Sequence, residues 1–140
     1  MNLYDLHSNP EGLYGFDVAP YKMPKLAYEL AKRNRKLRPK LEPVIMKDPM
    51  CACLYALNVL MRPWPEAEPV IMKDPYSAYL YAAYVLERRW PEAEPYIMKN
   101  SRWAYEYAGF ILERLWPEAE PYIIKDKFWW NQYRRRFNLL

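Results

Sequence analysis

Threonine is absent from the 140-residue chain, and glycine occurs only three times. Strands are rich in β-branched and aromatic residues, and tight hairpin turns depend on glycine or asparagine. A chain short of threonine and glycine is therefore poorly suited to strands joined by such turns, and an all-α fold is predicted. At this length the chain can bury a hydrophobic core as one domain.

Histidine and cysteine are also scarce, with one histidine, His7, and two cysteines, Cys51 and Cys53. Residues two apart point in different directions from a helix, so a disulfide between the cysteines is not expected. A zinc site would need further ligands, and His7 lies in a different segment. We expect no metal and no cofactor, and small buried or half-buried helix residues at both cysteine positions. Free thiols fit a reducing, cytoplasmic environment.

Signatures of an enzyme are missing as well. No serine or cysteine stands at a suggestive spacing from the histidine, and no glycine-rich phosphate-binding loop is present. Pairs of acids two residues apart do occur, but they recur as Glu66 and Glu68, Glu92 and Glu94, and Glu118 and Glu120. Repetition of this kind favours a structural role at the starts of helices, where the helix dipole stabilises negative charge. We expect the protein not to be an enzyme.

Neither a long apolar run nor a secretion signal is found. No stretch approaches eighteen uncharged apolar residues, so no membrane contact is expected, and MNLYDLHSNPEG lacks a basic segment followed by an apolar one. The net charge is +4: residues 1–40 hold eight Lys/Arg against four Asp/Glu, residues 41–120 eight against twelve, and residues 121–140 five against one. Basic ends around an acidic middle do not resemble one continuous stripe for a nucleic-acid backbone.

An eleven-residue motif recurs three times with a strict period. WPEAEPYIMKN spans Trp90–Asn100, WPEAEPVIMKD lies 26 residues earlier and WPEAEPYIIKD lies 26 residues later. A period of this size is typical of stacked supersecondary units. A degenerate copy, MPKLAYELAKRNRKLRP, comes first, and the last copy is truncated. We therefore predict an N-terminal segment with a degenerate capping repeat (1–37), tandem helical repeats (38–125) and an aromatic and basic capping helix (126–140).

Each repeat contains signals for two helices, of which the longer begins after an Asp-Pro pair. Asp74 and Pro75 are a favourable N-cap and first helical residue, and a helix of roughly fourteen residues is expected to follow. Successive residues of a helix turn by about 100°, which gathers apolar residues on one face. That face consists of Ala78, Tyr81, Ala82, Val85 and Leu86. Its alanines predict close packing of neighbouring helices, with the tyrosine filling the gap between them.

The recurring motif itself predicts the shorter helix, with acids near its start and Lys99 at its end. We expect Glu94 to cap a helix that begins at Pro95, because an interior proline costs about 3 kcal/mol. The alternative places Pro95 inside the first turn, where its missing N–H matters little. Since neither helix can bury its apolar face alone, an α-solenoid-like array of 26-residue helix-turn-helix repeats is predicted.

The outward side of the longer helices differs between repeats and is unusually apolar. Its three positions carry Leu54, Leu80 and Glu106; Leu57, Ala83 and Gly109; and Asn58, Tyr84 and Phe110. An exposed apolar and aromatic patch usually marks a partner interface or a self-association surface. We take Leu80, Tyr84 and Phe110 as candidate partner-binding residues.

An arginine also recurs once per repeat, at Arg62, Arg88 and Arg114. Stacking of the repeats would align the three side chains. They are expected to pair with the recurring glutamates of neighbouring repeats, or alternatively to form a track for phosphates or for the carboxylates of a partner. The tryptophans at the junctions, Trp64, Trp90 and Trp116, are expected to be wedges between repeats, with stacking of bases as the alternative.

The two ends of the chain are expected to seal the array. The N-terminal copy is crowded with basic residues, and aromatic residues of KFWWNQYRRRF, including Phe128 and Trp130, would close the other end. Trp130, Arg134, Arg135 and Arg136 are further candidates for partner contacts. Three arginines at a terminus suit an acidic protein surface, and in combination with aromatic residues they also suit nucleic acid.

The string RRWPEAEPYIMKNSRWAYEYAGFILERLWPEAEPYIIKD resembles the RWPEAEPYIMKDP-type tandem repeats of uncharacterised proteins of large bacteriophages and other viruses. The resemblance covers roughly residues 38–128 and implies a viral source and a life in the cytoplasm of an infected host. It brings no activity and no binding residue with it.

Together these patterns predict a non-enzymatic helical-repeat protein that binds another protein, preferably one with an acidic surface. The resemblance makes a viral inhibitor or modifier of a host factor or defence complex the expected role. Two alternatives remain open at this stage: a nucleic-acid-binding protein that uses the arginines and the C-terminus, and a self-assembling structural module, since repeat arrays can also stack end to end.

Overall fold

The computed structural model describes residues 23–139, and all regular secondary structure within them is helical, as predicted. The segment before residue 23, with His7 and most of the predicted N-terminal segment, lies outside the described residues. The longer helices, counted with the π-helical stretches that continue three of them, are α2 (Met23–Arg33), α4 (Pro49–Tyr55), α6 (Pro75–Tyr81), α8 (Ser101–Tyr107) and α10 (Lys127–Arg136). The shorter helices are α3 (Arg38–Ile45), α5 (Glu68–Ile71), α7 (Glu94–Ile97) and α9 (Glu120–Ile123).

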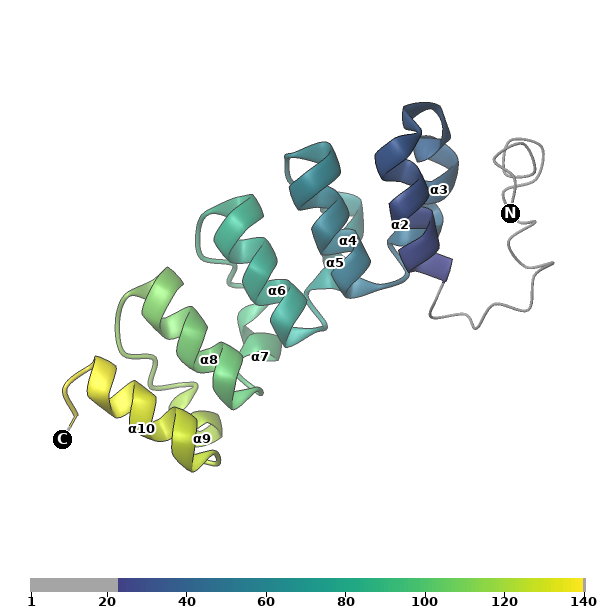
Figure 1. Ribbon diagram of the computed structural model, residues 1–140. Coiled ribbons are helices and arrows are strands. Elements are labelled where there is room, and N and C mark those ends of the chain that lie inside the picture. Colours follow the sequence, from purple (N-terminus) through teal and green to yellow (C-terminus); the bar gives the residue numbers. More distant parts are fainter. Residues whose placement is uncertain (1–22, 140) are drawn as a thin grey trace.

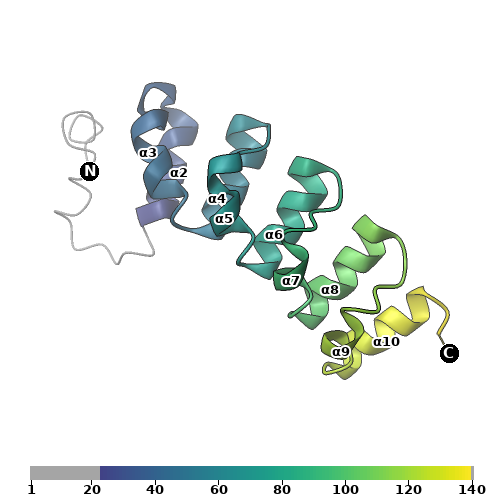
Figure 2. The same ribbon diagram turned by 180° about the vertical axis from the view of Figure 1, so that it is seen from behind.

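The longer helices lie side by side in chain order, from α2 at one end to α10 at the other (Figure 1). Each of them packs on the next long helix, and the shorter helices run along their other side (Figure 2). A unit of the structure is therefore one long helix, an extended return segment and one short helix. The spacing of these units follows the 26-residue period of the sequence.

The starts of the longer helices are capped by the residues that the sequence indicated. The carboxylate of Asp48 accepts a hydrogen bond from the amide of Cys51 at 2.8 Å, and that of Asp74 accepts one from Ser77 at 2.9 Å. Pro49 and Pro75 follow as first helical residues, where a missing N–H has no cost. In the third repeat Asn100 takes the same capping role.

The expected start of the short helix is wrong by one residue. α7 begins at Glu94 with Ala93 as its N-cap, so Glu94 does not cap a helix that begins at Pro95. Pro95 falls in the first turn, and the helix contains only four residues. The carboxylate of Glu94 is directed to side chains of the core instead of to the backbone of its own helix.

The ends of the longer helices are unusual. α4, α6 and α8 each continue into a five-residue stretch of π-helix, over Ala56–Leu60, Ala82–Leu86 and Ala108–Leu112. The next residue adopts a left-handed conformation, with φ of 54° at Met61, 53° at Glu87 and 52° at Glu113. Such positions favour glycine, because a Cβ atom there crowds the backbone. The turn to the extended return segment is therefore strained in three successive repeats.

Relief of this strain predicts a stabilising substitution at Met61, whose side chain is 80% exposed. Met61→Gly is expected to unfold with a free energy about 1 kcal/mol higher than that of Met61→Ala, because both remove the side chain but only glycine removes the Cβ. Urea denaturation followed by circular dichroism measures the difference. Equal stability of the two variants would show that the left-handed turn carries no strain.

The core consists of the face that the helical periodicity predicted. Ala78, Tyr81 and Ala82 have no exposed surface, and the equivalent residues of α4 and α8 are equally buried. Val85 and Leu86 are only half-buried, because they lie in the π-helical stretch near the end of the helix. Small alanines let adjacent helices approach closely, and the tyrosine rings fill the remaining space.

The two ends of the array are closed differently from the repeats between them. In α2 the buried Ala27 and Ala31 stand where the repeats have their core alanines. In α10 Tyr133 is buried and Trp130 is half-buried, but Phe128 is 59% exposed and does not close the end as expected. The side of α8 that α10 covers contains Tyr105 and Gly109, whereas the equivalent positions of α10 are Asn131 and Arg135. Polar replacement on this outer side suits a terminal repeat.

Candidate partner-binding surface

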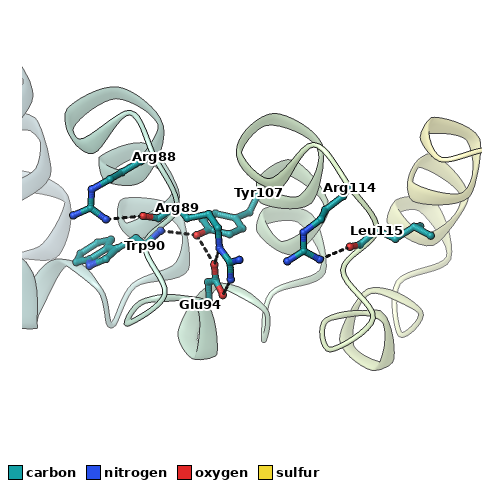
Figure 3. A network of polar contacts seen from close by, with 7 residues as sticks. All are labelled: Arg88, Arg89, Trp90, Glu94, Tyr107, Arg114 and Leu115. Carbon is teal, nitrogen blue, oxygen red and sulfur yellow. Dashed lines mark hydrogen bonds and ion pairs between the residues drawn. The ribbon is translucent and has the colours of Figure 1, made fainter.

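A chain of hydrogen bonds through a buried tyrosine joins each repeat to the next. It engages some of the repeated glutamates, which are therefore not free to contact a partner. The hydroxyl of Tyr107 donates to Glu94 at 2.9 Å and accepts a hydrogen bond from the amide of Trp90 at 2.8 Å (Figure 3). The same arrangement recurs 26 residues earlier, at Tyr81, and 26 residues later, at Tyr133. The second glutamate of each repeated pair thus accepts a hydrogen bond from a buried tyrosine.

One repeat adds an ion pair to this chain. The guanidinium of Arg89 binds both carboxylate oxygens of Glu94 at 2.9 Å (Figure 3). Neighbouring repeats have Pro63 and Leu115 at the position of Arg89, so the pair occurs once. The charged hydrogen bonds with Glu94 raise the pKa of Arg89 above its already high value.

The tryptophans at the junctions are wedges, as predicted. Trp64, Trp90 and Trp116 are nearly completely buried, and each ring lies about 5 Å from the core tyrosine that precedes it. A buried ring cannot stack on a nucleic-acid base, so the alternative interpretation of these three residues is wrong.

The recurring arginines are exposed and held by the backbone. Arg88 donates from Nη1 to the carbonyl oxygen of Arg89 at 2.8 Å, and Arg114 makes the same contact with Leu115 (Figure 3). Arg62 makes it with Pro63. The expected pairing with the glutamates of neighbouring repeats is wrong, because within residues 23–139 none of the three arginines forms an ion pair with a repeated glutamate. Three aligned guanidinium groups remain directed toward solvent.

Among the outward positions, the structure separates exposed residues from packed ones. Tyr84 and Phe110 are 57% and 59% exposed at equivalent positions of adjacent repeats. Leu80 is half-buried against the core, so its expected exposure on the outward side is wrong; Leu54 is packed in the same way. The reason is that a neighbouring long helix lies on that side: Leu54 lines a cleft together with Lys25 and Tyr28 of α2.

Shallow clefts run between consecutive long helices beside these aromatic rings. The cleft between α4 and α6 is lined by Leu57, Met61 and Tyr84 among others, and the cleft between α6 and α8 by Ala83, Tyr84, Glu87 and Phe110. The third cleft, between α8 and α10, contains Gly109, Phe110, Glu113 and Arg136. All three occupy equivalent places in the repeat.

The C-terminal candidates do not form one basic patch. Arg136 lies in the third cleft, where its guanidinium covers the ring of Phe110 and donates to the carbonyl of Gly109 at 2.9 Å. Arg134 is half-buried and donates to the carbonyl of Leu139 at 3.2 Å. Arg135 is exposed, and Trp130 is half-buried against the ring of Tyr133. Arg135 and Arg136 are both exposed, but Arg136 is held by its contacts with Phe110 and Gly109.

A second aromatic cluster was missed by the sequence analysis. Tyr76 stacks on Trp103 with ring centroids 4.3 Å apart, and the guanidinium of Arg102 lies 4.5 Å from Trp103 and 5.4 Å from Trp129. These residues stand on α6, α8 and α10 near the starts of the helices. The available signal was the change from Met50 to Tyr76, Arg102 and Phe128 at one repeat position, since all of these are large side chains on an outward turn.

The two cysteines are not ionised near neutral pH, although Cys51 lines a cleft together with Tyr28 and Leu54. Cys51 and Cys53 are buried, and burial raises the pKa of each thiol to about 12. Thiolates are the metal-binding and nucleophilic form, so both side chains behave as small apolar residues near neutral pH. Within residues 23–139 no cluster of three or more metal-binding side chains is present, and no helix is long and apolar enough to cross a membrane.

Comparison of the chain with protein-family models, with curated proteins and with solved structures gave no match.

Proposed function

We propose that this chain is a non-enzymatic protein whose repeats form an α-solenoid-like array, and that it binds another protein through the outward ends of α6 and α8. The observation that carries the proposal is the exposure of Tyr84 and Phe110 at equivalent positions of two adjacent repeats. Large aromatic rings left in water are enriched in the centres of protein interfaces, where they supply much of the binding energy. A shallow cleft between the two rings offers a partner side chain a place to insert.

The distribution of variation supports this proposal. Buried positions repeat closely, as in the alanines, tyrosines and tryptophans of the core, because each repeat must pack on the next. The exposed position of Tyr84 instead carries Asn58, Phe110 and Arg136 in the other units. Packing does not require these changes, so they are suited to recognition of a particular partner.

Exposed arginine side chains extend the proposed surface beyond the rings of Tyr84 and Phe110. Arg62, Arg88 and Arg114 are exposed near the same ends of the long helices, one for each repeat. Their contacts with backbone carbonyls restrict the side chains and leave donors for further hydrogen bonds. A partner with carboxylates beside an apolar centre would fit this row. The resemblance to viral repeat proteins extends the proposal to an inhibitor or modifier of a host factor in the host cytoplasm.

The same arginine row favours nucleic acid as a second candidate. A strand with regularly spaced phosphates could follow guanidinium groups that are aligned by the repeat. Two observations reduce the number of groups that a nucleic-acid strand could contact. The junction tryptophans are buried, and the guanidinium of Arg136 lies over the ring of Phe110. Binding of a generic single-stranded oligonucleotide at low salt, weakened steeply by added salt, would support this candidate over the protein partner.

Self-assembly into longer arrays is less well supported than either candidate. The outer side of α10 carries polar Asn131 and Arg135 where a continuing array would have packed residues. Burial of such groups without partners is unfavourable. A constant molecular mass in light scattering over a wide range of protein concentration is the result that excludes self-assembly.

Capture of a partner from host lysate tests the proposed function. We expect the double variant Tyr84→Asp/Phe110→Asp to lose the captured protein, because two carboxylates would replace the apolar centre of the interface. Affinity should fall by at least about tenfold, the ratio that corresponds to about 1.4 kcal/mol.

Phe128→Asp is the matched control, since Phe128 is as exposed as Phe110 but lies on α10 outside the proposed surface. It should retain the captured protein, and circular dichroism should show that all variants keep their helicity. Equal capture by the double variant and the unmodified protein would contradict the proposed function.

A further inference from the structure

The contact made by Arg136 shows how the cleft between α8 and α10 accommodates a cation. Its guanidinium carbon lies 4.8 Å from the centre of the Phe110 ring, and Nη2 donates to the carbonyl oxygen of Gly109 at 2.9 Å. Glu113 lines the same cleft. A Cβ atom at position 109 would lie 2.5 Å from Nε of Arg136, so glycine makes room for the side chain. An aromatic face and a carbonyl thus contact the guanidinium, and a carboxylate lines the same cleft.

The carbonyl of Gly109 is available because of the way the helix ends. The amides of Glu113 and Arg114 both donate to Ala108, and neither reaches Gly109. The last carbonyls of a helix need partners from outside it, and the negative end of the helix dipole attracts a cation. Arg136 supplies both the donor and the positive charge.

The same three groups occur 26 residues earlier, without an arginine. Tyr84 stands for Phe110, Ala83 for Gly109, and Glu87 for Glu113. The amides of Glu87 and Arg88 both donate to Ala82, so the Ala83 carbonyl is left open in the same way. Phe110 occupies the position of Arg136 and has no group to donate. The cleft between α6 and α8 has a volume of about 250 Å³.

At the equivalent positions, the first cleft of the series lacks the aromatic ring and the carboxylate, although Tyr84 and Glu87 of the following repeat line its other side. Asn58 stands where the others have Tyr84 or Phe110, and Met61 stands in place of the carboxylate. Arg62 also lines that cleft. The aromatic ring, the open carbonyl and the carboxylate therefore occur together at these positions in two clefts. In the cleft between α8 and α10 Arg136 already fills the site, whereas the cleft between α6 and α8 has no such arginine within residues 23–139.

We propose that the cleft between α6 and α8 is a guanidinium-binding site, which takes an arginine side chain of the partner protein between the rings of Tyr84 and Phe110. The arginine would donate to the Ala83 carbonyl as Arg136 donates to that of Gly109 one repeat later, in a cleft that the Glu87 carboxylate also lines. Because the Cβ of Ala83 occupies the space that Gly109 leaves open, the guanidinium would lie farther from the helix than that of Arg136. This inference rests on the proposed protein-binding function and names the residue type that enters its centre.

The charges around the cleft agree with a cationic occupant. Glu87 is exposed and has no ion pair within residues 23–139. The neighbouring Arg88 donates to the carbonyl of Arg89. Arg114 holds the equivalent place beside Glu113, and Arg136 occupies its cleft nonetheless. A neighbouring arginine of this kind therefore does not exclude a guanidinium from the site.

Titration of the full chain with N-acetyl-arginine amide, followed by amide NMR, tests the site. We expect millimolar binding with shifts concentrated at Ala83–Glu87 and Phe110. Tyr84→Ala and Glu87→Gln should each weaken it by about threefold to tenfold, as expected for a cation–π contact and an exposed charge pair. Glu92→Gln, a change of an exposed acid outside the cleft, should leave the affinity unchanged.

N-acetyl-citrulline amide is the decisive ligand control, because it keeps the shape of arginine and lacks the charge. Binding of citrulline as strong as that of arginine would overturn the proposal, and so would the absence of shifts at Ala83–Glu87. Shifts produced by an oligonucleotide at Arg62, Arg88 and Arg114, with none produced by arginine in the cleft, would replace it with nucleic-acid binding.

A second variant tests the comparison between the two clefts. Arg136→Ala should open the cleft between α8 and α10, and N-acetyl-arginine amide should then shift the Gly109 amide as well. Failure to do so in a variant that keeps its helicity would overturn the inference. A partner whose capture depends on Tyr84 and Phe110 but not on any of its arginines would refute the guanidinium site and leave the proposed function in place.

Discussion

Raising the pH from 9 to 11 is expected to unfold this protein cooperatively. Four tyrosines, at positions 55, 81, 107 and 133, have no exposed surface and donate to glutamates of the core. Burial raises the pKa of each hydroxyl, and the nearby carboxylate raises it further; for Tyr133 the pKa rises from 10.0 to about 12. For Tyr81, Tyr107 and Tyr133 a tryptophan amide offsets part of the increase.

The direction of the pH effect follows from the tyrosine pKa values, which are higher in the native state than in the unfolded state. Above pH 10 the unfolded chain loses tyrosine protons that the native state retains, so the free energy of unfolding falls as the pH rises. The stabilisation is complete below the unfolded pKa of 10.0 and is lost as the pH rises toward the native value. Each group contributes about 1.4 kcal/mol per pH unit in this window, so the four together remove about 5 kcal/mol by pH 11. Such a loss is comparable to the whole stability of many domains.

Far-ultraviolet circular dichroism and tyrosinate absorbance, recorded together against pH, measure this transition. The absorbance of the buried tyrosines should appear in the same pH interval in which helicity is lost. A Cys51→Ala/Cys53→Ala variant serves as the control, because it removes the raised thiol pKa values of about 12 and should keep the steep fall above pH 10. Retention of full helicity after all tyrosines have ionised would contradict the hydrogen-bond chain.

Replacement of Trp90 by alanine is expected to lower the free energy of unfolding by about 3–5 kcal/mol, the cost typical of deleting a buried aromatic ring. The side chain is 2% exposed, and its ring lies 5.0 Å from that of Tyr81. The cavity would open at the junction of two repeats, where neither neighbour can move inward without shifting its own helix. The loss would therefore affect the contact between repeats rather than one helix.

Trp103→Ala is the matched control for this prediction. Trp103 is half-buried and stacks on Tyr76 at the surface, so its removal should cost about 1–2 kcal/mol. Urea denaturation of both variants measures the difference in the free energy of unfolding. Equal losses in Trp90→Ala and Trp103→Ala would show that the junction tryptophans are not the principal wedges.

Much of the fold could be predicted from the sequence because its signals are local and repeated. The Asp-Pro caps, the spacing of Ala78 and Ala82, and the Trp-Pro junctions each indicate a helix boundary or a buried face by themselves. Repetition at 26 residues allowed each prediction to be checked against two other copies. The exposure of Tyr84 and Phe110 was also predictable from periodicity.

Errors arose where a side chain depends on a partner far along the chain. Glu94 was predicted to serve its own helix, but the hydroxyl of Tyr107, thirteen residues later, determines its position. Leu80 was predicted to be exposed, because a single helix does not show which of its sides the neighbouring helices cover. Arg136 was predicted to contact a partner as one of three arginines at the C-terminus, although it donates to the carbonyl of Gly109, 27 positions earlier.

The sequence by itself therefore determined the helices, their boundaries to within a residue or two, and the repeated buried face, since capping, periodicity and proline act over a few neighbouring residues. Only the tertiary structure decided which acids are buried acceptors, which arginines are held by carbonyls and which cleft already contains a cation. These outcomes depend on how closely one repeat approaches the next. Groups 13 to 27 residues apart in the sequence meet there, and each acceptor is bound by a donor from another part of the chain.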